Sequence, residues 1–256
     1  MALLADAPAG RHFAQFHRTS DSLTESIASF LQSGIRHSNS VIVIATPELR
    51  DRLVTRLTED RVNLEALSRS GQLDLIDAAQ LLAAFMPDGV PEWPRFRSTM
   101  MPILARVEAS GRGIRVFVEM GSILWREGNT EGAIRLENLW NTLAGFHSFA
   151  LYCGYALDTQ RAESYAGPLE DVGHAHSDIL GTEDDEHFSV ALDRASKEIF
   201  GITLSQMAGM TNHDGARRFP SGQRTMLWVT RNLPLSTAQL AERARRYFQE
   251  VVTGRT

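Results

Sequence analysis

Three histidines and one glutamate have side chains suited to binding a metal ion or a polar ligand. The segment VGHAHSDIL carries His174 and His176 in an H-x-H pattern, which can place both imidazoles on one side of a strand. His12 lies near the N-terminus, and Glu119 follows a long apolar run. Convergence of these groups would create a metal site, but the spacing fixes neither a third ligand nor its distance. Capping or core histidines are the alternative. We therefore predict no metal site and leave the cofactor unassigned.

Phosphate chemistry would be expected where a strand meets a helix, as in the stretch VIVIATPELRDRL. Val41 to Ala45 predicts a buried strand, and Thr46 followed by Pro47 is typical of a helix start. The stretch contains neither glycine nor lysine, so it lacks a phosphate-cradling loop. The helix N-terminus still offers free N–H groups, which keeps Thr46 a candidate for weak anion binding. Glu119 alone cannot perform phosphoryl transfer, and it has the alternative of pairing with a neighbouring arginine.

Aromatic side chains with one polar atom each could line a pocket for a small organic molecule. They are Trp125, Trp140 and Tyr155. Trp140 has the alternative of lying on the core face of an amphipathic helix. If Glu137, on the same helix, were buried, it would need a partner such as His12 or an arginine. An exposed position, paired with Arg135 or unpaired, is the alternative. The single cysteine, Cys153, is interpreted as a small buried apolar residue.

Composition limits the classes of function. The chain has 256 residues, a formal net charge of −5 and one cysteine, which excludes an intramolecular disulfide. No stretch approaches the ~20 apolar residues of a membrane span, and the N-terminus lacks the pattern of a signal peptide. We predict a cytoplasmic protein that binds neither membrane nor nucleic acid. No familiar catalytic motif is present, so we predict that it is not an enzyme.

Strands are predicted to alternate with helices through the first 160 residues. This pattern indicates a mostly parallel central sheet with helices on both faces. Ligands of such sheets bind beyond the carboxyl ends of the strands. The residues expected at those ends include Thr46, Glu119, Met120 and Tyr155. The first ten residues are predicted to be a flexible tail.

The last part of the chain, residues 181–256, is predicted to be an α/β extension that packs on or extends the same domain. RTMLWVT is a predicted strand and Ser236 to Val252 a terminal helix. The segment ITLSQMAGMTNHDGARRF has some helix-turn-helix character, and STAQLAERARRYF carries three arginines. A DNA-binding regulator is thus a less favoured alternative, because the net charge opposes it.

Several separated motifs resemble the MEDS family, the methanogen/methylotroph DcmR-type sensory domain. The first is the opening His-x-x-x-aromatic at His12 and Phe16, followed by GQLDLIDA. The segment IRVFVEMGSILWREGNTEGAIRLENLWNTLAGFHSFALYCGYAL resembles the family's R-V-F-G-E-M, L-W-x-x-G-N, L-E-x-x-W-N and F-x-L-L-C-A-Y patterns. It departs from them at Val118, where Gly is usual, and at Tyr152 and Gly154, where Leu and Ala are common. HAHSDIL matches its His-Ser element at His176. The resemblance covers residues 11–180, which we predict to be the sensory domain.

The resemblance implies a non-catalytic sensory module related to RecA/KaiC-type folds that has lost the phosphate loop. It implies a small organic ligand and a separate signalling partner, such as a histidine kinase or a regulator. Homo-oligomerisation stays open. The predicted ligand-binding residues are His12, Thr46, Glu119, Met120, Trp125, Glu137, Trp140, Tyr155 and His176. An atypical nucleotide-binding or ATPase protein of the same fold is the alternative.

Overall fold

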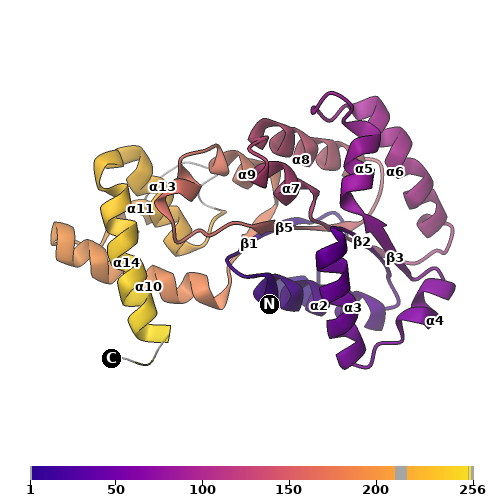
Figure 1. The fold of residues 1–256 in the computed structure, drawn as a ribbon, viewed down its shortest axis with the longest axis horizontal. Helices are drawn as coiled ribbons and strands as arrows, with labels where there is room; N and C mark the ends of the chain where they lie inside the picture. Colours follow the sequence, from indigo (N-terminus) through magenta and orange to yellow (C-terminus); the bar gives the residue numbers. More distant parts are fainter. Residues whose placement is uncertain (1, 211–217, 253, 255–256) are drawn as a thin grey trace. The chain divides into compact units, whose positions relative to one another are not determined.

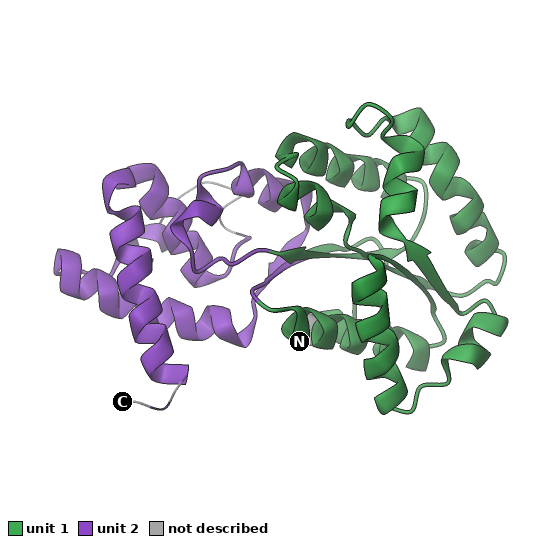
Figure 2. Cartoon of the chain, viewed as in Figure 1, with its two compact units in different colours: residues 1–13, 19–156 green, residues 14–18, 157–256 purple. Residues whose placement is uncertain are grey.

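The computed structural model describes residues 2–210, 218–252 and 254, and the chain forms two compact units (Figure 2). Unit 1 comprises residues 1–13 and 19–156, and unit 2 comprises residues 14–18 and 157–256. The division after Ala156 falls earlier than the boundary near residue 180 that the sequence leads us to expect.

Parallel strands form one six-stranded sheet in the order β3-β2-β4-β5-β1-β6 (Figure 1). The strands are β1 (His12–His17), β2 (Ser40–Ala45), β3 (Leu73–Asp77), β4 (Ile114–Val118), β5 (Ala150–Ala156) and β6 (Asp178–Leu180). This confirms the predicted α/β class with a parallel sheet. In unit 1 the register of β2 and β4 pairs Ile44 with Val118, so the two strands end side by side.

Helices cover both faces of the sheet in unit 1. Helices α2 (Ser20–Arg36) and α3 (Pro47–Glu59) lie on one face, and α5 (Ala78–Phe85), α6 (Trp93–Glu108), α7 (Met120–Arg126) and α8 (Thr130–Ala144) lie on the other (Figure 1). The short helices α1 (Ala2–Ala5) and α4 (Leu64–Arg69) complete the unit. The central strands β2 and β4 are buried throughout, as is typical of parallel sheets, whereas the edge strand β3 is partly exposed.

The sequence signals for the strand-to-helix junctions act as expected. Thr46 is the N-cap of α3, and its hydroxyl accepts a hydrogen bond from the backbone N–H of Leu49. Asp77 caps α5 in the same way through the N–H of Gln80. At the end of β4 the sequence predicts a strand to Met120, but the strand ends at Val118 and α7 begins at Met120.

Within unit 1, Arg115 connects the N-terminal segment to the rest of the unit. Its guanidinium donates to the carbonyl oxygens of Leu4 (3.2 Å), Ala5 (2.9 Å) and Phe30 (3.1 Å), and it lies 5.3 Å from the centre of the Phe30 ring. Arg115 and Leu4 are both buried. Leu4 and Ala5, which lie in the segment that the sequence predicts to be a flexible tail, thus have defined contacts with a buried cation.

Unit 2 is mostly helical. Its helices are η1 (Ala162–Tyr165), α9 (Leu169–Ala175), α10 (Glu183–Phe200), α11 (Leu204–Gly209), α13 (Ser221–Asn232), η2 (Pro234–Ser236) and α14 (Thr237–Val252). The predicted strand RTMLWVT is wrong, because these residues lie inside α13. The described residues after Gly181 form helices and no strand, so the extension is not α/β there. Part of the helix-turn-helix candidate, residues 211–217, lies outside the described residues.

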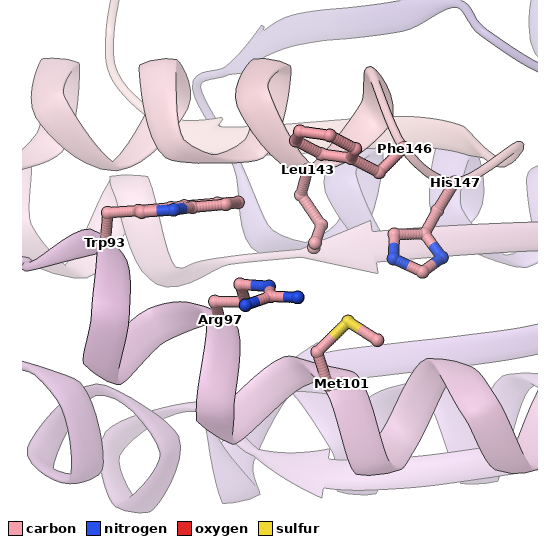
Figure 3. Close-up of a pocket in the computed structure, with 6 residues that line it drawn as sticks. All are labelled: Trp93, Arg97, Met101, Leu143, Phe146 and His147. Atoms are coloured by element: carbon pink, nitrogen blue, oxygen red, sulfur yellow. The ribbon is translucent and has the colours of Figure 1, made fainter.

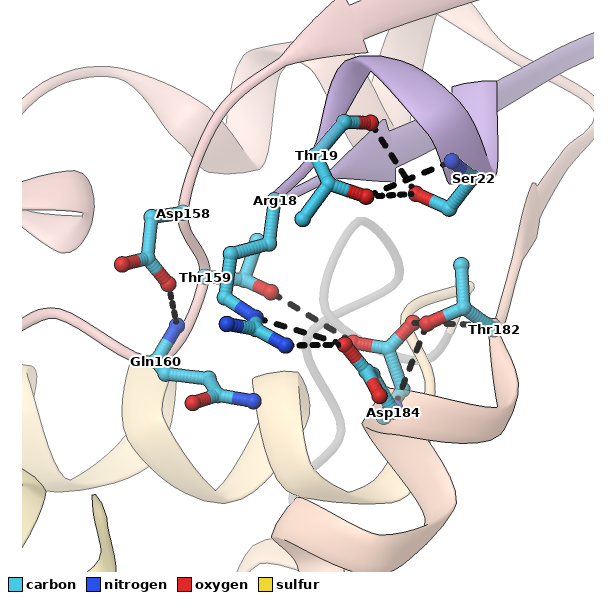
Figure 4. Close-up of polar contacts among 9 residues, drawn as sticks. Arg18, Thr19, Ser22, Asp158, Thr159, Gln160, Thr182 and Asp184 are labelled. Carbon is cyan, nitrogen blue, oxygen red and sulfur yellow. Dashed lines mark hydrogen bonds and ion pairs between the residues drawn. The ribbon is translucent and has the colours of Figure 1, made fainter. Parts of the chain in front are cut away.

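The acidic run EDDE starts α10 in unit 2. Thr182 and Asp185 form a capping box in which each side chain bonds the backbone N–H of the other residue. The carboxylate of Asp185 also accepts from Gln223 of α13 (2.7 Å). Beside it, Arg18 donates to Asp184 at 2.8 Å (Figure 4). These contacts explain why an acidic run lies at the start of a helix, where the helix dipole stabilises negative side chains.

None of the helices in the described part of the chain combines the length and apolar character that crossing a membrane requires.

His17 should make the folded chain sensitive to acid. The side chain is 2% exposed, and burial lowers its pKa from 6.5 to about 3. The unfolded chain therefore binds a proton below pH 6.5 that the folded chain does not, and stability falls as the pH drops from 6.5 toward 3. The maximum slope from this group is about 1.4 kcal/mol per pH unit.

We predict that His17→Gln flattens the dependence of the unfolding free energy on pH between pH 6 and pH 4. The measurement is urea unfolding of the full chain at several pH values, with His37→Gln as a control at an exposed histidine. Parallel curves for the wild type and His17→Gln would contradict the prediction.

Candidate functional site

Thr46 and Glu119, two of the predicted ligand residues, lie together where β2 and β4 end. The backbone N–H of Thr46 donates to Glu119 Oε2 at 2.8 Å, and its hydroxyl donates to the same oxygen at 2.9 Å. Arg126 lies 3.4 Å from Glu119 Oε1, and Glu119 is 4% exposed. The carboxylate is thus held between the start of α3 and the start of α7.

The hydrogen bonds between Thr46 and Glu119 lie at the carboxyl-end edge of the sheet, where ligands of parallel α/β proteins usually bind. The chain runs outward from β2 to β3 on one side and from β4 to β5 on the other, so β2 and β4 flank the switch point of the topology. Here the negative side chain of Glu119 occupies the N-terminus of α3, where an anionic ligand would otherwise bind. The geometry gives Thr46 and Glu119 a structural role.

A second, fully buried polar cluster lies deeper in unit 1. It contains His12 of β1, Glu137 of α8, and Cys153 and Tyr155 of β5, which are between 1% and 5% exposed. His12 Nε2 lies 3.2 Å from Cys153 Sγ and 3.3 Å from Glu137 Oε2. Cys153 Sγ lies 3.4 Å from the same oxygen. Three groups that ligate metals or transfer protons therefore form one compact triangle.

Neighbouring groups fix the orientation of this cluster. The Tyr155 hydroxyl donates to Glu137 Oε1, and the Nδ1–H of His12 donates to Asn141 Oδ1 at 2.9 Å. Gly121 of α7 is packed against this hydrogen bond, since a Cβ at that position would lie 2.6 Å from the Tyr155 hydroxyl oxygen and 2.7 Å from Glu137 Oε1. A side chain at this position would collide with the cluster, so the glycine of the EMGSILW segment is required by packing.

Burial controls the protonation of the cluster. Removal from water raises the pKa of the Cys153 thiol well above its ordinary value, and the neighbouring Glu137 carboxylate raises it further. The same two causes, in the same order, raise the pKa of Tyr155. Without a bound cation both groups stay protonated at neutral pH, so Cys153 is not a nucleophile in this state.

The remaining predicted residues have different surroundings. Met120 is buried at the start of α7, and Trp125 packs edge-on against Tyr155, with ring centres 6.2 Å apart. Trp140 is fully buried between Phe96 and Phe149 and so takes the core position that was its alternative. His176 belongs to unit 2, where its Nδ1–H donates to the carbonyl of Val172 at 2.6 Å.

The predicted partners of the histidines are corrected in part. Glu119 bonds Thr46 and Arg126, whereas His12 lies against Glu137, so the two residues belong to separate contacts within unit 1. His174 is exposed, and its nearest acidic partner is Asp171 at 3.8 Å. The expectation that a buried Glu137 would pair with His12 matches the structure.

A cleft of about 260 Å³ lies between α6 and the end of α8. Figure 3 shows its lining side chains pointing toward a common space, namely Trp93, Arg97, Met101, Leu143, Phe146 and His147. The rings of Trp93 and Phe146 are stacked with centres 6.5 Å apart. His147 pairs with Glu108 at 2.7 Å, while no ion-pair partner for Arg97 occurs among the described residues. The cleft is therefore aromatic with one cation available.

Sequence reasoning missed some members of both sites. Cys153 was assigned to the core because its neighbours are apolar, and Asn141 was noted only as part of a motif. None of the cleft residues was predicted. The spacing of Trp93, Arg97 and Met101 at every fourth position of α6 was the available signal, because such residues share one helix face.

Comparison with known proteins gives one match. A family model described as "MEDS: MEthanogen/methylotroph, DcmR Sensory domain" matches residues 11–171, which is more than half of the chain. Neither a curated protein nor a solved structure matched. The relation to RecA/KaiC-type folds therefore stays a prediction.

Fold and site together define a parallel α/β domain that lacks a phosphate loop and contains a buried polar cluster. The chain belongs to the MEDS sensory-domain family. This confirms the resemblance drawn from the motifs and supports a role in sensing or signalling. His12, Glu137, Asn141, Cys153 and Tyr155 all stand at motif positions, and the fold brings these distant segments together.

Loss of the Glu119 carboxylate should destabilise unit 1. We predict that Glu119→Ala lowers the free energy of unfolding by about 2–3 kcal/mol, because the N–H and hydroxyl of Thr46 both lose their buried acceptor. Glu119→Gln keeps one carbonyl acceptor and should cost about half as much. Urea unfolding monitored by circular dichroism measures both. Glu127→Ala, an exposed loss of the same charge at the opposite end of α7, is the control, and equal losses in Glu119→Ala and Glu127→Ala would refute the role of the contact.

Proposed function

We propose that this chain is a non-enzymatic sensory domain that binds a small organic molecule in the α6–α8 cleft and signals to a separate protein. The proposal places it in the cytoplasm, with a histidine kinase or a regulator as the partner. Family membership supports the sensory role. The observation that carries the ligand site is the aromatic cleft lined by Arg97, whose guanidinium has no ion-pair partner within the described ranges.

The lining of the cleft favours a ligand with an apolar body and one anionic group. Trp93, Met101, Leu143 and Phe146 supply apolar and aromatic contact. Arg97 supplies a cation that suits a carboxylate. The volume of about 260 Å³ is small, which favours a compact molecule such as a small aromatic or aliphatic acid.

A signal could travel from the cleft along α8. Leu143 lines the cleft at the end of this helix, while Glu137 and Asn141 of the same helix hold the buried cluster. Behind the cleft, Trp140 of α8 packs on Phe96 of α6 with ring centres 5.2 Å apart. A ligand that binds one position of α8 more tightly would shift the population toward that position.

The two alternative functions receive less support. Nucleotide binding at the β2–β4 edge is opposed by the Glu119 carboxylate, which lies where phosphate would bind. DNA binding by the last helix is opposed by the ion pairs of its arginines. Arg243 lies 3.1 Å from Glu198, and Arg246 pairs with Glu242. Arginines paired with carboxylates are less available to phosphates.

We predict that small carboxylic acids stabilise the chain in a thermal unfolding scan. Benzoate is the first probe of a panel, and benzyl alcohol is its neutral counterpart. At one hundred times its dissociation constant a ligand stabilises the fold by about 2.7 kcal/mol. For a chain of this size that raises the midpoint by roughly 5–10 °C. Mg·ATP, tested in parallel, should cause no shift.

Variants locate the binding. Phe146 is 75% exposed, so Phe146→Ala should fold normally and lose most of the shift. Arg97→Gln should remove the preference for the acid over the alcohol. Val54→Ala, an exposed apolar truncation on α3, is the control and should keep the full shift. No shift with any acid in the panel, or a shift that Phe146→Ala retains, would overturn the assignment to this cleft.

A further inference from the structure

The buried triangle of His12, Glu137 and Cys153 has the geometry of a metal site. In tetrahedral zinc coordination, the usual bond lengths place a thiolate sulfur about 3.5 Å from an imidazole nitrogen or a carboxylate oxygen, and place that nitrogen about 3.3 Å from that oxygen. The corresponding distances here are 3.2 Å, 3.4 Å and 3.3 Å. One ion could therefore contact all three ligand atoms after shifts of a few tenths of an ångström.

The orientation of His12 points to a cation in this place. Its Nδ1–H donates to Asn141 Oδ1, so in the neutral ring Nε2 carries a lone pair. That lone pair faces Glu137 Oε2, a second acceptor, at 3.3 Å. The Cys153 thiol, 3.2 Å from Nε2 and 3.4 Å from Oε2, can give its one proton to only one of these two acceptors, whereas a metal ion would bind both. The competing explanation is one additional proton between His12 Nε2 and Glu137 Oε2, with no metal bound.

Outer contacts complete the pattern of a metal site. Metal-binding histidines usually donate their other ring N–H to an oxygen acceptor, as His12 does to Asn141. Ligating carboxylates are usually hydrogen-bonded through their second oxygen, as Glu137 is to Tyr155. Both contacts leave Nε2 and Oε2 facing Cys153.

Charge favours a divalent ion. A thiolate and a carboxylate together carry two negative charges, and burying them without compensation is costly. A divalent cation neutralises both. The mixed sulfur, nitrogen and oxygen ligands suit Zn²⁺, which accepts all three donor types.

We propose that His12, Glu137 and Cys153 bind one divalent transition-metal ion of the zinc class in unit 1. This site is separate from the cleft that we propose for the organic ligand. A fourth position is filled by water or another group. The inference does not depend on the proposed function, because the ligand atoms belong to the buried cluster.

Cobalt substitution tests the site directly, because the chain has a single cysteine. The full-length chain is produced in zinc-depleted medium with Co²⁺, and its metal content and absorption spectrum are measured. We expect one cobalt ion per chain, visible bands typical of tetrahedral Co²⁺, and a thiolate-to-cobalt charge-transfer band. Only Cys153 can supply that thiolate. A folded wild-type chain without stoichiometric metal, or with metal but without the charge-transfer band, would refute the proposal.

Variants separate ligands from supporting residues. Cys153→Ser should lose the charge-transfer band, and Glu137→Gln should weaken metal binding. Tyr155→Phe should lower the affinity roughly 10- to 100-fold while the band persists, because it removes only an outer contact. His37→Gln, at an exposed histidine of the same unit, should change nothing. Unchanged affinity in both Glu137→Gln and Tyr155→Phe would contradict the assignment even if Cys153→Ser fails to fold.

Discussion

The carboxylate of Glu137 is the constraint on which much of unit 1 depends. A carboxyl group that is 1% exposed needs hydrogen-bond partners, and the surrounding side chains supply them. Cys153 and Tyr155 are two positions apart on β5, so both side chains reach Glu137 from the same face of the strand. β1 places His12 beside it, and Gly121 lets α7 pack over it without a clash. Strand order, helix placement and a glycine are thus all tied to one buried acid.

The general fold could be predicted because its signals are local. The run of β-branched residues in β2 and the Thr-Pro start of α3 act within a few residues of each other, so tertiary structure had little to change. RTMLWVT failed for the opposite reason. This short segment, with four consecutive apolar residues, fits a strand or a helix. Only the buried positions Thr225, Met226 and Val229 show that one helical face meets the core of unit 2.

The site was predictable only in part, because its members are far apart in the sequence. His12 and Glu137 are separated by more than a hundred residues, and no spacing rule relates them. The motif resemblance identified both positions, but the pairing of Glu137 with Cys153 depends on how α8 packs on β5. The cleft was harder still, since it needs the end of α8 to meet one face of α6. Exposed aromatics such as Phe146 look like ordinary surface residues until their neighbours are known.

The two proposed sites share α8, and this gives the domain a physical route for coupling. A ligand beside Leu143 would act on the end of the helix, whereas a metal ion on Glu137 would fix its middle to β1 and β5. Such an ion would hold α8 more rigidly than hydrogen bonds alone, because metal–ligand bonds tolerate little change in distance. Any response to a ligand in the cleft would then have to occur in the last turn of α8, beyond Asn141. The bound metal ion would thus determine which part of α8 can move when the ligand binds. By linkage, each site would change the binding free energy of the other by the same amount.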